Sequence, residues 1–585
     1  MIQRTGIPGF KKLSLLVLFG LVVASIAAGV WYKQNRHAPS ASQNYDVIVV
    51  GAGPGGIAAS LQAARMGAHV ALLEETDWIG GQMTAGAVGT MDEGNNVEAR
   101  KSGIYAEFVQ AITRYYGTRG RSTGTCYYYK DSLCVDPRDG QRILKQMLRR
   151  QSANLTVMTG VHVSSVLKQG NTVTGVVAGG KHMNSKVVID ADEYGDVIAM
   201  ANAAYRLGTV EVDPSTSGNS SAASSATSTA AGTAAAQTAA SSSASASPAA
   251  PSCIQATTYS AVMKYYPSGV PKSLQFTMAP PGYTPELRKH FASVVSAAVN
   301  TDYSKTHTSP GTYQSYTAWR GLPDLSNPKN YNVLQQGQDI TRTVLNLGND
   351  SPPNGKLSTS FISDPSARFK DTCQAKQLTL DLAYYIQHEL GQTNWAIAND
   401  EGYNTPYNRS HHCPSLASFV QMEDQLPQEP YVREGRRLVG EQTLTGTDLS
   451  KRPWTAGNPM PQYANSIAVG YYKMDLHGCN QPADLEPGLD NSSELSSDPK
   501  SGPFEIPMGV LIPQKVDGLL AAEKNISVSR LAEGAVREQP IAMDTGQAAG
   551  ALAVLAVQKH EQPRFVAAAD VQTVLKKAGV VTSVP

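Results

Sequence analysis

Two short hydrophobic runs near the start of the chain flank a glycine- and alanine-rich segment. Val47–Val50 is a β-branched run, which is typical of a buried strand, and a second apolar run, Val70–Leu73, ends in Glu74. Ile57–Met66, between the two runs, is rich in alanine and leucine and indicates a helix. The order strand, helix, strand predicts a βαβ unit and an α/β fold.

Similar patterns predict further strands and helices along the chain. Apolar and polar residues alternate over 155–159, 161–168 and 172–177, which predicts a β-meander with a turn at Gly170-Asn171. Other strands are expected at 186–191, 507–513 and 516–522. Helices are expected at 102–115, 140–150, 197–204, 285–299, 373–390, 541–557 and 570–578.

Changes in composition divide the chain into six parts. Most of 211–252 is Ser, Ala, Thr and Gly, which cannot bury enough apolar surface to order itself. The expected parts are 1–43, a signal anchor and tether; 44–210, the first part of a nucleotide-binding domain; 211–252, a disordered Ser/Ala-rich insertion; 253–505, a substrate domain; 506–560, the return segment of the nucleotide-binding domain; and 561–585, a C-terminal helix and tail.

The N-terminus predicts a membrane-spanning helix. Basic residues precede an uncharged run, Leu13–Tyr32, whose length as a helix is about 30 Å, one hydrocarbon core. The slightly stronger positive charge at its N-terminal side indicates that the body is exported to the periplasmic or extracellular side. The alternative is a signal peptide cut near residues 25–28. The length of the run and the aromatic pair Trp31-Tyr32 favour an uncleaved anchor.

Length and charge narrow the possible functions. The 585 residues allow two to four domains with a sizeable core. The net charge of +1 does not suggest nucleic-acid binding. The six cysteines are compatible with disulfides.

A glycine fingerprint joins the first predicted strand to the helix. Gly51, Gly53 and Gly56 have G-x-G-x-x-G spacing, and Glu74 follows Gly56 by 18 residues. Gly51 allows the tight turn, Gly53 lets a diphosphate approach the backbone, and Gly56 lets helix and strand pack closely. The helix N-terminus offers N–H groups to phosphates, and the acid accepts hydrogen bonds from a ribose. The pattern predicts a dinucleotide site.

Several segments together resemble the FAD-dependent oxidoreductases of the glutathione-reductase-like superfamily, and among them the bacterial FAD-binding dehydrogenases. The resemblance implies an α/β protein with a Rossmann-type FAD-binding domain and an inserted mixed α+β substrate domain, preceded here by the N-terminal transmembrane helix. The segments that carry the resemblance are 50–56, 80–84, 187–191, 193–196, 430–440, 474–477, 506–507, 516–522 and 546–550.

The resemblance also implies which residues hold FAD. Gly80 and Gly81 let the backbone pass close to the diphosphate and flavin. The segment 546–550 begins a helix whose N-terminus stabilises negative charge on reduced flavin. The chain departs from the family pattern at Glu523, where glycine is usual. The implied cofactor-binding residues are Gly51, Gly53, Pro54, Gly55, Gly56, Glu74, Glu75, Gly80, Gly81, Gln82, Met83, His162, Asp190, Ala191, Glu523, Gly546, Gln547, Ala548 and Ala549.

Candidate catalytic residues come from the expected substrate domain. His477 is a candidate general base, and the alternative is a structural histidine bonded to the backbone. Arg433 is a candidate for binding a substrate carboxylate or the flavin, as are Arg436 and Arg437. The alternative for these arginines is ion pairs with Glu434 and Glu441.

Histidine and cysteine recur in two short segments, 411–413 and 477–479. Their spacing fits no established zinc pattern, so no metal is expected, and a Cys413–Cys479 disulfide explains them equally well. Cys126 and Cys134 allow a small disulfide loop or two free thiols. His69 is discounted as a covalent flavin site.

Together, these expectations describe an exported, membrane-tethered FAD-dependent oxidoreductase. It oxidises a small organic substrate by hydride transfer to flavin N5 and passes electrons to O2, a quinone or a carrier protein. The alternatives are a flavin monooxygenase or C=C reductase, and a surface binding protein with a vestigial nucleotide fold.

Overall fold

The computed structural model describes most of the chain beyond the N-terminal segment. The described residues are 43–93, 100–120, 124–125, 133–214, 253–295, 298–300, 312–314, 320–326, 341–450, 461–495 and 503–584. The predicted membrane-spanning helix, nearly all of the Ser/Ala-rich insertion and Cys126 lie outside these residues. The corresponding predictions therefore stay predictions.

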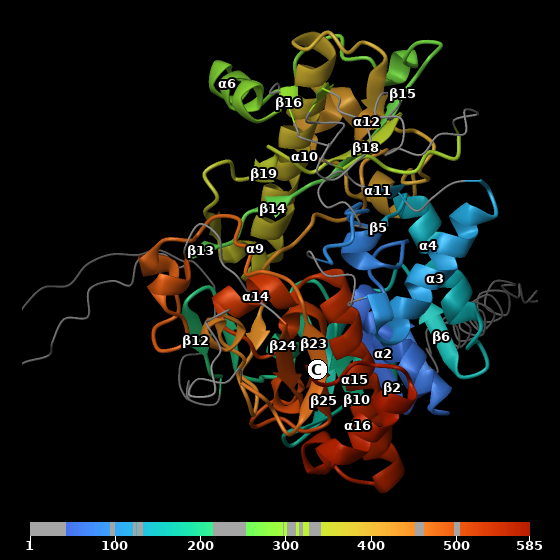
Figure 1. Cartoon of the computed structure of the whole chain (residues 1–585), viewed down its shortest axis with the longest axis vertical. Coiled ribbons are helices and arrows are strands. Elements are labelled where there is room, and N and C mark those ends of the chain that lie inside the picture. The colour runs from blue at the N-terminus through green and yellow to red at the C-terminus, as the bar shows by residue number, and fades with distance from the viewer. Residues whose placement is uncertain are drawn as a thin grey trace, which may run out of the picture.

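A five-stranded parallel sheet forms the lower part of the molecule in Figure 1. Its central strand, β2 (Val47–Val50), lies between β10 (Val187–Asp190) and β3 (Val70–Leu73). The edges are β6 (Leu155–Met158) beside β3 and β25 (Leu519–Ala521) beside β10. All residues of β2, β3 and β10 are buried, which explains their continuous apolar runs. The predicted βαβ unit is confirmed, and the C-terminal part of the chain returns to the same sheet.

The predicted β-meander is wrong in its first strand. β6 joins the parallel sheet, whereas β7 (Val163–Gln169), β8 (Thr172–Ala178) and β9 (Lys181–Asn184) form a separate antiparallel sheet. A two-residue strand, β1 (Gln43–Asn44), lies parallel to β9. Three of the four residues of β6 are exposed or half-buried because this strand lies at the edge of the sheet. An edge position therefore produced the alternation.

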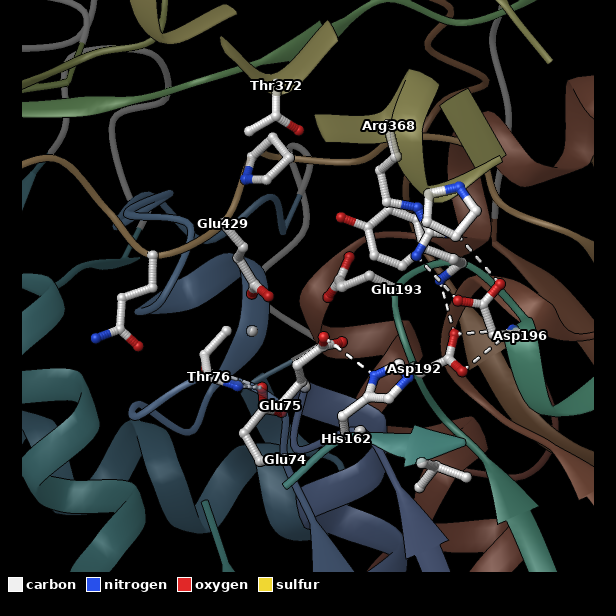
Figure 2. A pocket seen from close by; sticks show the side chains of 18 of the residues that line it. Glu74, Glu75, Thr76, His162, Asp192, Glu193, Asp196, Arg368, Thr372 and Glu429 are labelled. Carbon is white, nitrogen blue, oxygen red and sulfur yellow. Dashed lines mark hydrogen bonds and ion pairs between the residues drawn. The ribbon is translucent and has the colours of Figure 1, made fainter. Parts of the chain in front are cut away.

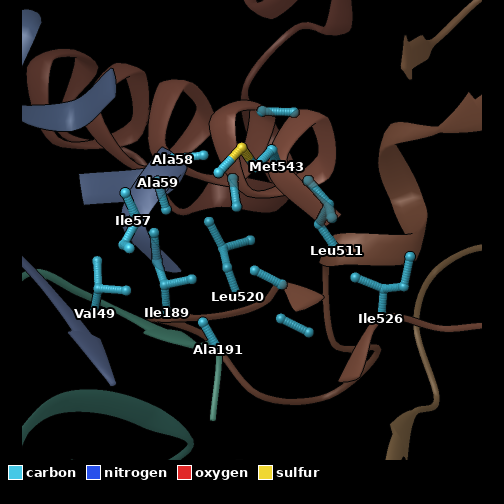
Figure 3. Close-up of a cluster of buried hydrophobic side chains, with 14 of the residues drawn as sticks. Val49, Ile57, Ala58, Ala59, Ile189, Ala191, Leu511, Leu520, Ile526 and Met543 are labelled. Carbon is cyan, nitrogen blue, oxygen red and sulfur yellow. The ribbon is translucent and has the colours of Figure 1, made fainter. Parts of the chain in front are cut away.

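Helices α2 (Pro54–Arg65) and α15 (Gln539–Lys559) pack together on the sheet. Figure 3 shows Ala58 and Ala59 of α2 beside Met543 of α15, with Ile189 and Leu520 of the sheet below them. The two backbones are close: a Cβ on Gly546 would lie 2.1 Å from the carbonyl oxygen of Gly55. The helix predicted at 541–557 is confirmed, but the helix N-terminus implied at 546–550 is wrong. Gly546 lies inside a helix that begins at Gln539, and its small size serves the helix contact.

Within the described ranges, a single helix is long and apolar enough to cross a membrane, and it is α15. In the most apolar stretch of this helix, 89% is buried inside the protein, so α15 is a core helix of this fold.

Shorter elements complete the lower part of the molecule. Four of the predicted helices are confirmed, with bounds that differ by a few residues: α3 (Gly103–Gly117), α4 (Pro137–Arg149), α5 (Asp196–Met200) and α16 (Ala568–Lys577). The strand predicted at 507–513 is wrong: β24 (Phe504–Pro507), paired with β23 (Ser466–Gly470), ends where a 3₁₀ turn begins at Met508.

The inserted region forms the upper part of Figure 1. Its long helix, α10 (Pro365–His388), descends toward the parallel sheet. A sheet of β18 (Arg342–Leu345), β15 (Ala261–Tyr265) and β21 (Trp395–Ile397) lies beside it. Helix α6 (Pro285–Val294) is shorter than predicted.

Two disulfides tie this region together, and they differ from the predicted Cys413–Cys479 pair. Cys373 of α10 bonds to Cys413, and Cys253 bonds to Cys479. Cys479 lies beside the strand β13 (Cys253–Ile254), because its sulfur is 3.1 Å from the Ile254 carbonyl oxygen. Cys413 lies beside α10 instead, so the predicted pair is wrong.

Candidate functional site

A cavity of about 490 Å³ lies at the carboxyl ends of β2, β3 and β10. Ligands of open parallel sheets bind at this edge. Gly51 and Gly53 after β2, Glu74 after β3 and Glu193 after β10 line one wall. The opposite wall comes from the inserted region: α10, α11 (Pro406–Ser410) and the segment 428–430. Figure 2 shows Glu193 from one wall and Glu429 from the other pointing into the space between the two walls.

The glycine loop brings bare backbone to the cavity. Gly51 has a φ of +93°, and a Cβ there would lie 2.2 Å from the Ala191 carbonyl oxygen, so this position accepts only glycine. A Cβ on Gly81 would lie 2.8 Å from the Cα of Gly53. The two predicted glycine segments therefore face each other at the cavity. This leaves a cradle that side chains would fill.

A carboxyl group accepts a hydrogen bond from an amide at the start of α2. The Gly55 N–H donates to Oε1 of Glu523 at 2.5 Å, and no side chain of α2 itself caps this end. Burial raises the pKa of Glu523 to about 7. Lys524 next to it forms a 2.5 Å ion pair with Glu193. The chemistry of these donors therefore fits an anionic group such as a diphosphate.

Glu74 is fixed at the end of β3. Its Oε2 accepts from the Ala52 N–H at 2.8 Å, and its Oε1 accepts from the N–H and the hydroxyl of Thr76, both at 2.8 Å. Burial raises the pKa of Glu74 to about 7, although these hydrogen bonds lower it. A carboxylate oxygen accepts more than one hydrogen bond, so Glu74 can also accept from sugar hydroxyls in the cavity.

The next residue, Glu75, pairs with His162 at the rim of the cavity. The Oε1 of Glu75 is 3.2 Å from Nδ1 of His162, and the hydrogen bond raises the pKa of His162. Both side chains are more than half exposed.

The predicted cofactor residues fall into two groups. Those that line the cavity are Gly51, Gly53, Glu74, Glu75, Gly81, His162 and Ala191. Those that lie outside its lining are Pro54, Gly55, Gly56, Gly80, Gln82, Met83, Asp190, Glu523, Gly546, Gln547, Ala548 and Ala549.

Several residues of the second group make structural contacts. Asp190 is fully buried and accepts from the Ile198 N–H at 2.8 Å. Gln547 accepts from the Ile104 N–H at 2.9 Å. Gln82 donates to the Arg537 carbonyl oxygen at 2.9 Å, beside the true start of α15.

His477 lies between two carboxylates, outside the cavity lining. Its Nδ1 is 2.9 Å from Asp350, and its Nε2 is 3.2 Å from Asp475. Arg433 pairs with the same Asp350 at 3.1 Å. Burial alone would raise the pKa of Asp350, but Arg433 and His477 hold it far below its usual value. The structure thus joins the two predicted catalytic residues through Asp350, with both ring nitrogens of His477 engaged.

The neighbouring arginines form ion pairs, of which one, Arg437 with Glu434, was predicted as the alternative. Arg437 pairs with Glu486 at 2.6 Å, with Glu533 at 3.0 Å and with Glu434 at 3.7 Å. Arg436 pairs with Asp196 at 2.5 Å. The expected partner Glu441 pairs with Arg564 instead.

Sequence reasoning assigned no role to several residues of the cavity wall. Arg368 of α10 pairs with Asp196 at 2.9 Å, and its guanidinium lies 3.6 Å over the ring of Tyr194. Tyr407 stacks on His411, with ring centroids 4.1 Å apart. The segment 193–196 could be recognised in the sequence, because it is polar and follows a predicted buried strand. Arg368, Tyr407 and Glu429 carried no local signal, because tertiary folding brings them to the sheet.

In the part of the chain that the structure describes, no group of three or more His, Cys, Asp or Glu residues could hold a metal ion.

Comparisons with known proteins give a family and several distant relatives. The family described as "FAD dependent oxidoreductase" matches residues 46–575. The chain is 28% identical over 187 residues to sarcosine oxidase subunit alpha of Corynebacterium sp. (strain P-1), over 31% of this chain and 19% of that protein. It is 29% identical over 163 residues to the probable electron transfer flavoprotein-quinone oxidoreductase YdiS of Escherichia coli (strain K12), over 25% of this chain and 36% of that protein.

A solved structure, THI4 of Thermovibrio ammonificans, matches 31% of this chain and 68% of its own, with 22% identity and a TM-score of 0.20. The chain spans well under half the length of the two curated relatives.

Proposed function

The chain belongs to the family of FAD-dependent oxidoreductases, and from this premise we propose that FAD binds in the cavity at the carboxyl ends of β2, β3 and β10. The protein then oxidises a small organic substrate by hydride transfer to flavin N5. The observation that carries the proposal is that the glycine loop and Glu74 lie side by side on one wall of this cavity.

The residues of the cavity wall divide the binding of FAD between them. The amides at the start of α2 suit the diphosphate, and Glu74 suits the ribose hydroxyls. The backbone between Gly80 and Gln82 leads away from this point toward the first residues of α15, because Gln539 donates to Gln82 at 3.2 Å. The N-cap residue of α15, Glu538, makes no side-chain hydrogen bond to the helix amides. These amides favour negative charge nearby.

FAD, when bound, supplies the acceptor for the substrate hydride. The protein excludes water, orients both partners and manages protons. His477, with Asp350 and Asp475, is the expected site of proton handling, and Arg433 beside Asp350 is the expected site for an anionic group of the substrate.

Export across a membrane is the second part of the proposal. Disulfides persist in oxidising compartments, and the described residues contain two, Cys253–Cys479 and Cys373–Cys413. The hydrophobic run 13–32 supports a tether to the membrane. The electron acceptor of an exported enzyme is O2, a quinone or a carrier protein, and the similarity to a protein named as a quinone oxidoreductase favours a quinone.

An anaerobic screen of the purified protein tests this function. We expect flavin to be released on denaturation, and a substrate to bleach the visible absorbance of oxidised flavin without O2. Colourless protein that does not take up added FAD would contradict the proposal. Transfer of an oxygen atom from O2 to the product would replace it with the monooxygenase alternative.

A further inference from the structure

Glu429 projects a carboxyl group into the FAD cavity from the inserted region. It lies on the wall opposite Glu74 and Glu193, and Figure 2 shows the Glu429 and Glu193 carboxyl groups pointing toward the same space. The Oε1 atom of Glu429 is buried and has no hydrogen-bond partner among the residues that the structure describes. A buried polar atom without a partner costs free energy, so this atom is suited to a ligand.

The carboxyl groups around Glu429 disfavour a negative charge on its own side chain. Lys524 is the cation that acts on Glu429, and it is already paired with Glu193. Burial, followed by Glu193 and Glu74, raises the pKa of Glu429 well above its usual value. The titratable groups that face Glu429 are Glu74, Glu75, Glu193, Lys524, Tyr194, Tyr259, Tyr403 and Tyr407.

The position of Glu429 relates it to the phosphate end of the cavity. Gln428 before it accepts from the Trp78 N–H at 3.0 Å, which holds this segment against the loop that leads to Gly81. Glu193, which faces Glu429, lies close to the glycine loop. Its Oε1 would be 3.1 Å from a Cβ on Gly81 and 3.7 Å from a Cβ on Gly53. A bound diphosphate would add further negative charge here, so an ionised Glu429 would repel it.

We propose that Glu429 is a neutral carboxylic acid that donates its O–H to a diphosphate oxygen of FAD, so that the inserted region holds the cofactor from the side opposite the glycine loop. The inference rests on the proposed FAD site. It assigns Glu429 a positioning role in cofactor binding. The proton stays on Glu429, and the hydrogen bond is strong because its acceptor is charged.

Two substitutions separate a neutral donor from a carboxylate. In Glu429→Gln the amide keeps an N–H donor but cannot ionise, whereas in Glu429→Leu the donor is lost. The measurement is the Kd of FAD for the flavin-free full chain, from about pH 6 to about pH 9, by quenching of flavin fluorescence. Glu389→Gln, in the same inserted region but outside the cavity lining, is the control.

We expect the Kd of the wild type to rise at the alkaline end of this range as Glu429 ionises, above the interval near pH 7 in which Glu74 titrates. Glu429→Gln should bind FAD at about pH 6 within about threefold of the wild type and lack this part of the pH dependence. Glu429→Leu should bind about tenfold more weakly, as expected for loss of one hydrogen bond to a charged acceptor.

Either of two results would overturn the inference: Glu429→Leu binding FAD as tightly as the wild type, or Glu429→Gln keeping the full pH dependence. Circular dichroism of each flavin-free variant shows whether it is folded. A wild type that binds no FAD at any pH would overturn the proposed function itself, and is distinguishable from both.

Discussion

Glu74 illustrates how one side chain can be placed by its neighbours for a single task. The N–H of Ala52 and both donors of Thr76 orient its carboxylate at the end of β3. Burial raises its pKa to about 7 in spite of these hydrogen bonds. Ribose hydroxyls would add donors to the ionised form.

The first prediction is that Glu74→Gln weakens FAD binding by about tenfold or more, because a charged acceptor is replaced by a neutral one. The contribution of Glu74 should also fall as pH drops below about 7, where the carboxylate becomes protonated. Equilibrium dialysis with FAD measures both effects. Glu107→Gln is the matched control, since Glu107 pairs with Arg65 and lies outside the cavity lining. An equal loss in both variants would contradict the role of Glu74.

At the scale of elements, the contact between α2 and α15 depends on small residues. Gly546 and Gly550 of α15 face the backbone of α2, where a Cβ would lie 2.1 Å from the Gly55 carbonyl oxygen and 2.3 Å from that of Ala59. The contact holds the start of α2, and with it the glycine loop, against the sheet.

The second prediction is that Gly546→Ala lowers the free energy of unfolding by about 1–3 kcal/mol, because the added methyl group forces the two helices apart. Urea denaturation measures the change. Gly117→Ala is the control: Gly117 is also helical, but a Cβ there would meet nothing within 4 Å. A Gly546→Ala protein as stable as the control would show that the helices are not in this contact.

The third prediction concerns the disulfide between α10 and Cys413, which lies in the cavity wall. Replacing both Cys373 and Cys413 by serine should lower the free energy of unfolding by about 2–4 kcal/mol, since the bond constrains the unfolded chain. It should also speed the release of FAD. Stopped-flow release and urea denaturation measure these effects. Unchanged release would mean that this wall does not enclose the cofactor.

On the scale of the whole molecule, several buried carboxyl groups have pKa values near neutral pH. Burial is the main cause in each, and their folded pKa values lie above the unfolded values near 4. The groups are Glu74, Glu523, Asp381 and Asp544 at about 7, Asp192 at about 6 and Glu401 at about 8.

The fourth prediction is that the flavin-free protein loses stability as pH rises from about 5 to about 8. A carboxyl group with a raised folded pKa stabilises the fold below its unfolded pKa, and this contribution is lost as pH rises through the folded pKa. Groups whose pKa is lowered, such as Asp324, titrate below this window. Urea denaturation at constant ionic strength measures the trend, and a rise in stability over the same range would contradict it.

The pattern of residues along the chain predicted those parts of the site that lie close together in the sequence. The strand, glycine loop, helix and Glu74 all fall within 47–74, where periodicity and spacing carry the information. The small residues at 546–550 permit a close approach, but a sequence does not say what approaches, and the neighbour is α2. Glu429 and Arg368 reach the cavity through folding of the inserted region, so no spacing pattern could reveal them.

The most direct measurement is a crystal structure of the protein loaded with FAD. We predict that the diphosphate lies against Gly53 and the first amides of α2, with the ribose hydroxyls within hydrogen-bond distance of Glu74. FAD bound elsewhere, with this cavity filled by protein side chains or Glu74 turned away from the ribose, would contradict the account.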